Sequence, residues 1–253
     1  MITYEYPFSE RVRTLLRLES LFGRAVYFSR LDGAAENHVA LGGIFEILDV
    51  VGRSDLKVDL FQELERQKQV LLGFCNNPGV SETALSGALH EIEQASAALL
   101  GVTGKFGQHL RDNDWLMSIK SRAAIPGGLC EFDLPSYHYW LNQPAQNRHA
   151  DLEQWISTIL PVRDALSIIL RLLRTSGQAE HICAVRGQYQ RMPGSTTAQM
   201  ACITLSSEET AIPEVSANRY ALNIRFVLPF EANSRPHHIC ERNVAFDLAI
   251  CTL

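Results

Sequence analysis

The sequence has little lysine, although its supply of positive charge is ordinary. Only four positions carry lysine, and arginine provides the rest of the 23 basic residues. Arginine is preferred where proteins bind carboxylates or form interfaces, but genomic base composition also enriches it without selecting any contact. The arginine excess therefore assigns no function by itself.

Paired cysteines and long apolar runs are also missing. The six cysteines form no CxxC pair, and residues 1–10 lack the apolar core of a signal peptide. The longest apolar segment, residues 159–173, is interrupted by Arg163, Asp164 and Arg171 and cannot cross a bilayer comfortably. We therefore predict a cytoplasmic protein with reduced thiols and no membrane span.

A net positive charge is lacking as well. The formal charge is −5, and no basic run is interleaved with aromatic residues, so we predict no nucleic-acid partner. Hydrophobic residues make up 46% of the 253 positions and charged residues 20%. These values are typical of a soluble globular protein with one or two domains.

Helical periodicity dominates the chain after a short alternating strand at residues 2–6. Ser9 is a plausible N-cap, and the apolar residues from Val12 to Phe22 recur at helical spacing. The same reasoning predicts further helices, at residues 37–51, 54–75, 81–99, 112–122, 134–141, 151–160 and 161–173.

The segment Ile125–Leu141 combines three backbone signals. Pro126-Gly127-Gly128 is a turn that stops a helix, residues 129–133 alternate as a short strand would, and Pro135 is a good first helical residue. Residues 220–228 alternate strictly, and similar runs at 181–192, 198–206 and 244–253 predict an antiparallel sheet.

These patterns predict an α+β protein. We expect a helical domain at residues 7–178, interrupted near 128–133, and a sandwich-like antiparallel β domain at 179–253. A small sheet needs further strands to bury its apolar face, so we expect segments 2–6 and 128–133 to join the β domain.

Signals for chemistry are weak. The segment GVTGKFG at 101–107 lacks the spacing of a phosphate-binding loop and is predicted to connect two helices. A zinc site is conceivable, but the ligand spacing is irregular, so no metal or cofactor is predicted. Its four ligands would be His237, His238, Cys240 and Cys251.

Six side chains are candidates for binding, although a single helix-face arginine is more often only solvated. They are Arg17, Arg53, Arg111, Arg122, His138 and Arg225.

Several blocks of the sequence together resemble the ZapD family of bacterial Z-ring-associated proteins, almost from end to end. The blocks are RTLLRLE at 13–19, LDVVGR ending at Arg53, RAAIPGG from Arg122, FDLPSYHYWL with His138, IRF at 224–226 and FDLAIC at 246–251. The resemblance implies a noncatalytic, homodimeric protein without cofactors. It would be recruited to the division ring and would cross-link FtsZ filaments by binding the FtsZ C-terminal tail.

The resemblance also implies roles for single residues. Arg17 and His138 match charged positions that the family uses for the FtsZ tail, and Arg53 and Arg225 match further basic positions. Arg111 and Arg122 are placed only by their proximity to a matching block. The chain departs from the family pattern at Asp114 and Ala221, where basic residues are expected.

A small-molecule enzyme remains the alternative. Its site would lie near Cys130 and His138, which a change from strand to helix separates. No recognisable nucleophile motif supports it.

Overall fold

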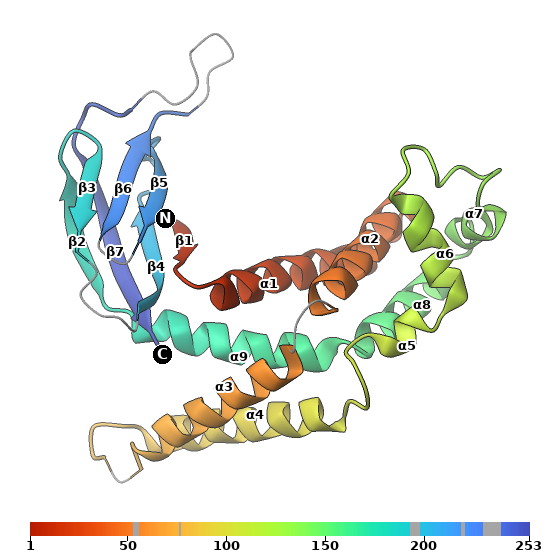
Figure 1. Cartoon of the computed structure of the whole chain (residues 1–253), viewed down its shortest axis with the longest axis horizontal. Coiled ribbons are helices and arrows are strands. Elements are labelled where there is room, and N and C mark those ends of the chain that lie inside the picture. The colour runs from red at the N-terminus through yellow and green to blue at the C-terminus, as the bar shows by residue number, and fades with distance from the viewer. Residues whose placement is uncertain (53–55, 76, 193–197, 219–220, 230–238) are drawn as a thin grey trace. The chain divides into compact units, whose positions relative to one another are not determined.

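The computed structural model describes residues 1–52, 56–75, 77–192, 198–218, 221–229 and 239–253. The chain forms two compact units. One comprises Met1–Arg13 and Leu170–Leu253, and the other comprises Thr14–Ile169. We call them the β unit and the helical unit. The α+β fold class predicted from the sequence is confirmed, with helices first and antiparallel strands in the C-terminal part (Figure 1).

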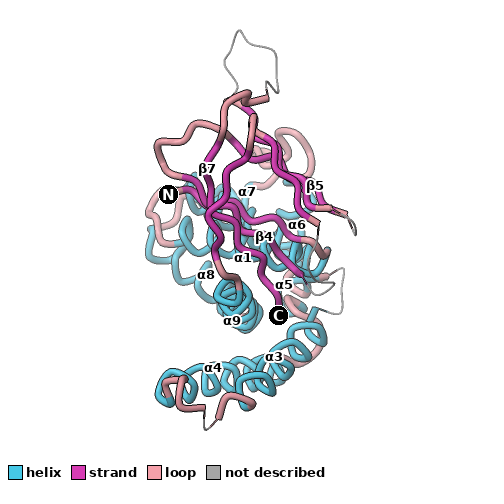
Figure 2. Tube along the Cα trace, turned by 90° about the vertical axis from the view of Figure 1, so that its left-hand side faces the viewer, coloured by secondary structure: helices cyan, strands magenta, loops and turns pink. Residues whose placement is uncertain are grey.

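The β unit consists of two antiparallel sheets. A four-stranded sheet has the order β1-β4-β7-β2, and a three-stranded sheet has the order β3-β6-β5. The two sheets lie face to face (Figures 1 and 2). The strands are β1 Ile2–Pro7, β2 Ala179–Ala184, β3 Gln188–Arg191, β4 Ala198–Leu205, β5 Ile212–Ala217, β6 Leu222–Val227 and β7 Val244–Thr252.

Alternation of side chains along the strands builds the core between these sheets. On β6, Leu222, Ile224 and Phe226 are buried, whereas Arg225 faces solvent. The ring of Phe226 lies 5.1 Å from that of Phe246 on β7, centroid to centroid, which joins the two layers. The predicted alternation of this strand is therefore confirmed from Leu222 to Phe226, but it fails at the end of the segment, where Val227 is buried and Leu228 is 42% exposed.

The predicted first strand is confirmed, and it pairs far along the sequence. Ile2 of β1 lies opposite Leu205 of β4, and the pairing continues to Pro7 opposite Met200. Glu5 on this strand binds Arg174 with an Nε to Oε1 distance of 2.6 Å. Thus β1 completes the four-stranded sheet, as a small sheet requires for its apolar face.

Helices make up most of the helical unit. Their starts follow local capping chemistry: the Oγ of Ser9 accepts the N–H of Val12 at 3.2 Å, and Pro135 occupies the first turn of its helix. The helices are α1 Glu10–Ser29, α2 Ala34–Val51, α3 Leu56–Leu72, α4 Glu82–Gly101, α5 Gln108–Arg111, α6 Asp114–Ala123, α7 Pro135–Leu141, α8 Ala145–Ser157 and α9 Leu160–Ser176. The ends of α1 and α9 are counted with the β unit.

Two close approaches organise the helical unit. Gly43 of α2 packs on Ala25 of α1, where an added Cβ would lie 3.1 Å from the Cβ of Ala25. Gly107 has a φ of 70°, and a Cβ there would overlap Leu48 at 2.2 Å. The helices α3 and α4 run side by side (Figures 1 and 2), and Lys68 pairs with Glu93 between them at 2.8 Å.

Three sequence predictions about elements are wrong. Residues 129–133 form turns rather than a strand, because local bonds satisfy the backbone, such as Asp133 N–H to the carbonyl of Cys130 at 3.0 Å. Helix α8 begins at Ala145, six residues before the predicted start. The edge strand β5, Ile212–Ala217, was not predicted, because Pro213 weakens the strand signal.

Candidate functional site

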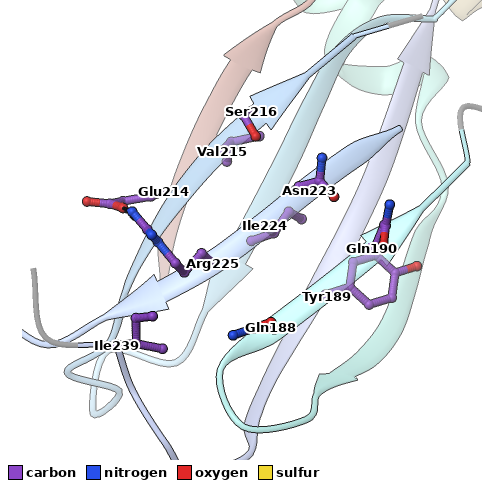
Figure 3. A pocket seen from close by; sticks show the side chains of 10 residues that line it. All are labelled: Gln188, Tyr189, Gln190, Glu214, Val215, Ser216, Asn223, Ile224, Arg225 and Ile239. Atoms are coloured by element: carbon purple, nitrogen blue, oxygen red, sulfur yellow. Dashed lines mark hydrogen bonds and ion pairs between the residues drawn. The ribbon is translucent and has the colours of Figure 1, made fainter. Parts of the chain in front are cut away.

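The outward face of the three-stranded sheet carries a polar groove of about 680 Å³ (Figure 3). Strand register places its polar side chains in two rows that cross the sheet. One row is Gln188, Arg225 and Glu214, and the other is Gln190, Asn223 and Ser216. Ile239 lies at one end of the groove. The sheet thus presents donors and acceptors at regular spacing, a surface suited to an extended polar ligand.

Arg225 is the cation in this groove. Its Nε donates to Oε2 of Glu214 at 3.1 Å, and the two side chains are 50% and 31% exposed. A guanidinium has five N–H donors, so the contact with Glu214 leaves capacity for a second acceptor. An acidic group that binds in the groove therefore either displaces Glu214 from Arg225 or shares the guanidinium with it.

Arg122 and His138 flank one turn segment of the helical unit. Arg122 Nη1 lies 3.9 Å from Oδ1 of Asp133, and His138 Nε2 lies 3.8 Å from Oε2 of Glu131. Phe132, between the two carboxylates in sequence, is 81% exposed. The structure therefore places these two predicted residues beside the same acidic turn. Their distances to its carboxylates are long enough for the carboxylate of a ligand to compete for either side chain.

Arg111 has a structural contact. Its Nη2 donates to the main-chain carbonyl of Leu48, near the C-terminal end of α2. A Cβ on Gly52 would lie 2.5 Å from that same nitrogen. The same carbonyl also accepts the N–H of Gly52, the residue after α2, at 3.0 Å. Arg111 therefore adds a second hydrogen bond near the C-terminal end of α2 and ties α5 to it.

Two predicted binding positions, Arg17 and Arg53, and the two departures from the family pattern, Asp114 and Ala221, remain. Arg17 is exposed on α1, whereas Arg53 lies outside the described residues. Asp114 occupies the first turn of α6, where a carboxylate favours the positive end of the helix dipole. The N–H of Ala221 donates to Oδ1 of Asn218 at 2.9 Å in the turn before β6. At both departures from the family pattern, the residue present thus has a local structural role.

Sequence reasoning missed a buried cation, Arg148 of α8, which is 5% exposed. Its Nε donates to Oδ1 of Asn37 at 2.7 Å, and its terminal nitrogens donate to main-chain carbonyls. These carbonyls belong to Asp32, Leu141 and Gln143. Arg148 therefore ties the α1–α2 connection to the α7–α8 connection, a link that no local sequence signal reveals.

An aromatic cluster was also missed. The three tryptophans of the chain, Trp115, Trp140 and Trp155, have ring centroids 5.8 to 6.0 Å apart. Tyr137 stacks on Trp140, and its hydroxyl is hydrogen-bonded to Nδ1 of His38 at 2.7 Å. Burial raises the pKa of Tyr137, which keeps this hydroxyl protonated. The aromatic residues are far apart in sequence, so only the fold reveals the cluster.

The alternatives for chemistry gain no geometric support in the described part of the chain. His138 contacts Glu131 and Asn142, and Cys130 is exposed without a described contact to the imidazole. Of the four residues weighed for zinc, His237 and His238 lie outside the described residues, and Cys251 instead faces Cys202 with an Sγ to Sγ distance of 3.7 Å. The described residues contain no group of three that could hold a metal ion.

Among the helices that the structure describes, none combines the length and the apolar character needed to cross a membrane.

The described residues thus combine a helical unit with a β unit whose outer sheet carries a polar groove. A family model described as ZapD, cell division protein, matches residues 16–225. Proteins named cell division protein ZapD are similar over the full length of both chains: one from Dechloromonas aromatica (strain RCB) is 62% identical, and one from Azoarcus sp. (strain BH72) is 57% identical. One from Nitrosomonas eutropha is 49% identical, again over the whole length of both chains. The chain belongs to the ZapD family of cell division proteins.

Proposed function

We propose that this protein is a noncatalytic, homodimeric adaptor of the division ring that binds the C-terminal tail of FtsZ and cross-links FtsZ filaments in the cytoplasm. Membership of the ZapD family is the observation that carries this proposal. The geometry supports it through exposed basic side chains on each unit. They are Arg17, Arg122 and His138 on the helical unit and Arg225 on the β unit.

Weak individual contacts suffice for such an adaptor. An exposed ion pair contributes about 0.2 to 1 kcal/mol, so no single arginine holds a tail. Arg225 and His138 each lie near a carboxylate of the chain itself, which weakens them further as isolated sites. A dimer with two tail sites gains about 10² to 10⁴ in avidity on a filament that displays many tails.

Co-sedimentation with FtsZ filaments tests the proposal. We expect this protein to pellet with and bundle intact filaments, and to lose both properties when the FtsZ tail is deleted. Because salt screens exposed charges over about 8 Å at physiological ionic strength, pelleting should decline across a rising salt series. Equal pelleting with tail-deleted filaments would exclude the tail as the binding partner.

A charge reversal tests the contribution of Arg17. Arg17→Glu should reduce co-sedimentation while the circular dichroism spectrum stays unchanged, since an exposed charge seldom determines folding. Arg11→Glu is the matched control, because Arg11 is also exposed on α1 but six residues, or about 1.7 turns, earlier and on another face. Equal losses in both variants would indicate a general charge effect rather than a site at Arg17.

A further inference from the structure

A second pocket, of about 560 Å³, is lined by residues of α6, α7 and α8 and of the α7–α8 connection in the helical unit. Figure 1 shows where these helices lie within that unit. Its floor and walls include Trp115, Tyr139 and Trp140, and the carboxylate of Asp151 lies beside them. None of its lining residues was among the binding positions predicted from the sequence. Its chemistry is also opposite to that of the cationic positions, because the charged side chain in the lining is an acid.

The aromatic walls are held in place by hydrogen bonds at their edges. The indole Nε1–H of Trp140 donates to Oδ2 of Asp151 at 2.8 Å, and that of Trp115 donates to Oγ of Ser136 at 3.1 Å. Trp140 is 7% exposed, whereas Tyr139 is 69% exposed. The pocket therefore has fixed indole walls and one accessible phenol ring at its rim.

Several side chains that line the pocket carry hydrogen-bond acceptors that have no donor among the described residues. Within the described residues, Asp151 has no cationic partner and its Oδ1 accepts no hydrogen bond, since its one described contact uses Oδ2. The side-chain amides of Gln143 and Asn147, which also line the pocket, make no hydrogen bond with any described residue. The lining of the pocket thus combines aromatic rings with three residues that carry side-chain oxygen acceptors.

We infer that this pocket binds an arginine side chain of a partner protein. A guanidinium is planar, stacks on aromatic rings and carries five N–H donors. The aromatic walls supply the cation–π surface, and the Asp151 carboxylate with the two amides supplies the acceptors. The inference goes beyond the proposed binding of the FtsZ tail by cations, and it does not depend on that proposal.

The tryptophans make the test direct. All three lie in the cluster around the pocket, so intrinsic fluorescence and the indole N–H resonances both report on it. The probe is the peptide acetyl-Gly-Arg-Gly-amide, titrated into the full chain at low salt. The matched control is the same peptide with citrulline, which keeps the shape of arginine but lacks its charge. We expect the arginine peptide to shift the Trp115 and Trp140 indole resonances and to bind at least about fivefold more tightly than the citrulline peptide.

Two pairs of variants locate the binding. Asp151→Asn keeps an acceptor for Trp140 but removes the charge, so it should abolish the preference for arginine over citrulline. Glu153→Gln, an equivalent change at an exposed position of the same helix, should leave that preference intact. Tyr139→Ala should weaken binding about threefold or more, and Tyr139→Phe should restore it because the ring face remains. Tyr139 is exposed, so its two variants keep the test valid even if Asp151→Asn folds poorly.

Three outcomes would overturn the inference. Equal binding of the arginine and citrulline peptides would exclude recognition of the charge. Unchanged arginine binding in both Asp151→Asn and Tyr139→Ala would place the peptide elsewhere. If no peptide bound and Tyr139→Ala instead altered the sedimentation coefficient, the pocket would be a contact between copies of this chain.

Discussion

The β unit and the helical unit use arginine in different ways. In the β unit, four of the described arginine pairs join carboxylates and guanidinium groups from different strands, helices or loops, whereas Arg13 pairs with Glu10 within α1. The helical unit also has arginine–carboxylate pairs, such as Arg24 with Glu46, but two of its arginines, Arg111 and Arg148, bind main-chain carbonyls. The four pairs of the β unit that join different elements are Arg174 with Glu5, Arg191 with Glu180, Arg225 with Glu214 and Arg242 with Glu209.

This difference separates arginines that can exchange partners from arginines that cannot. An exposed guanidinium paired with a carboxylate can turn to a second carboxylate at little cost, because surface pairs are weak. A guanidinium that donates to main-chain carbonyls cannot leave without removing hydrogen bonds that connect helices and loops of the fold. We therefore expect substitutions of the first kind to change binding and substitutions of the second kind to change stability.

The largest effect is expected for Arg148. Arg148→Met keeps much of the volume but leaves Asn37 and three main-chain carbonyls without their donor. The free energy of unfolding should fall by about 3 kcal/mol or more, measured by urea unfolding followed by circular dichroism at 222 nm. Arg163→Met, at a solvent-accessible position of α9 where the arginine pairs with its neighbour Asp164, should change it by less than about 0.5 kcal/mol. Equal effects of the two changes would contradict the structural role of Arg148.

A smaller loss of stability is expected for Arg111. Arg111→Met removes one of the two donors to the carbonyl of Leu48, which keeps the N–H of Gly52, and should lower the unfolding free energy by about 1 kcal/mol. Arg122→Met is the control, because Arg122 is 49% exposed and lies 3.9 Å from its carboxylate. If Arg122→Met proved the more destabilising of the two, the assignment of Arg111 to the end of α2 would be wrong.

The ion pair of Glu209 predicts a modest dependence of stability on pH. The hydrogen bond from Arg242 lowers the pKa of Glu209 below its ordinary value of 4.5, because it stabilises the carboxylate. The folded state therefore binds this proton less readily than the unfolded state, so the pair stabilises the fold above about pH 4.5 and the contribution disappears as the pH falls through the lowered pKa.

Unfolding midpoints measured between pH 7 and pH 3 should show this loss, which we expect to be at most about 1 kcal/mol. In Glu209→Gln the corresponding part of the pH dependence should vanish. An identical pH profile in the variant would assign the acid sensitivity to other carboxylates.

The smallest effect concerns Glu214 and rests on the proposed binding of the FtsZ tail. Glu214→Gln removes the carboxylate that competes for Arg225, so affinity for a tail peptide should rise about two- to threefold. Fluorescence anisotropy of a labelled tail peptide measures it, and Glu208→Gln, an exposed position before β5, is the control. A fall in affinity would mean that Glu214 positions Arg225 rather than competing for it.

The sequence predicted those parts of the fold that depend on local chemistry. Ser81 was identified as a helix start, and its hydroxyl does accept the N–H of Ala84, because a cap and its helix lie within one turn of chain. The prediction failed at residues 129–133, where alternation alone favoured a strand. A strand also needs a partner at the right register, and short-range pattern carries no information about that partner.

The candidate site was less accessible from the sequence. The resemblance identified exposed cations, but it could not tell that Arg111 binds a helix end or that Arg225 already binds Glu214. The pocket of Trp115, Tyr139, Trp140 and Asp151 depends on three helices that meet only in the folded unit. Its residue types are unremarkable in sequence, since aromatic residues at helical spacing usually signal a core.

The pairing of β1 with β4 has a consequence for folding during synthesis. Ile2 finds its partner Leu205 only after about two hundred further residues have been made. At a synthesis rate of about 5 to 20 residues per second, that strand waits on the order of 10 to 40 s with its backbone unpaired. The helices made in the meantime close short loops and can fold on the ribosome first. A nascent chain therefore carries an unpaired strand segment for most of its translation. Its solubility in that interval depends on how well Ile2, Tyr4 and Tyr6 are shielded from other chains.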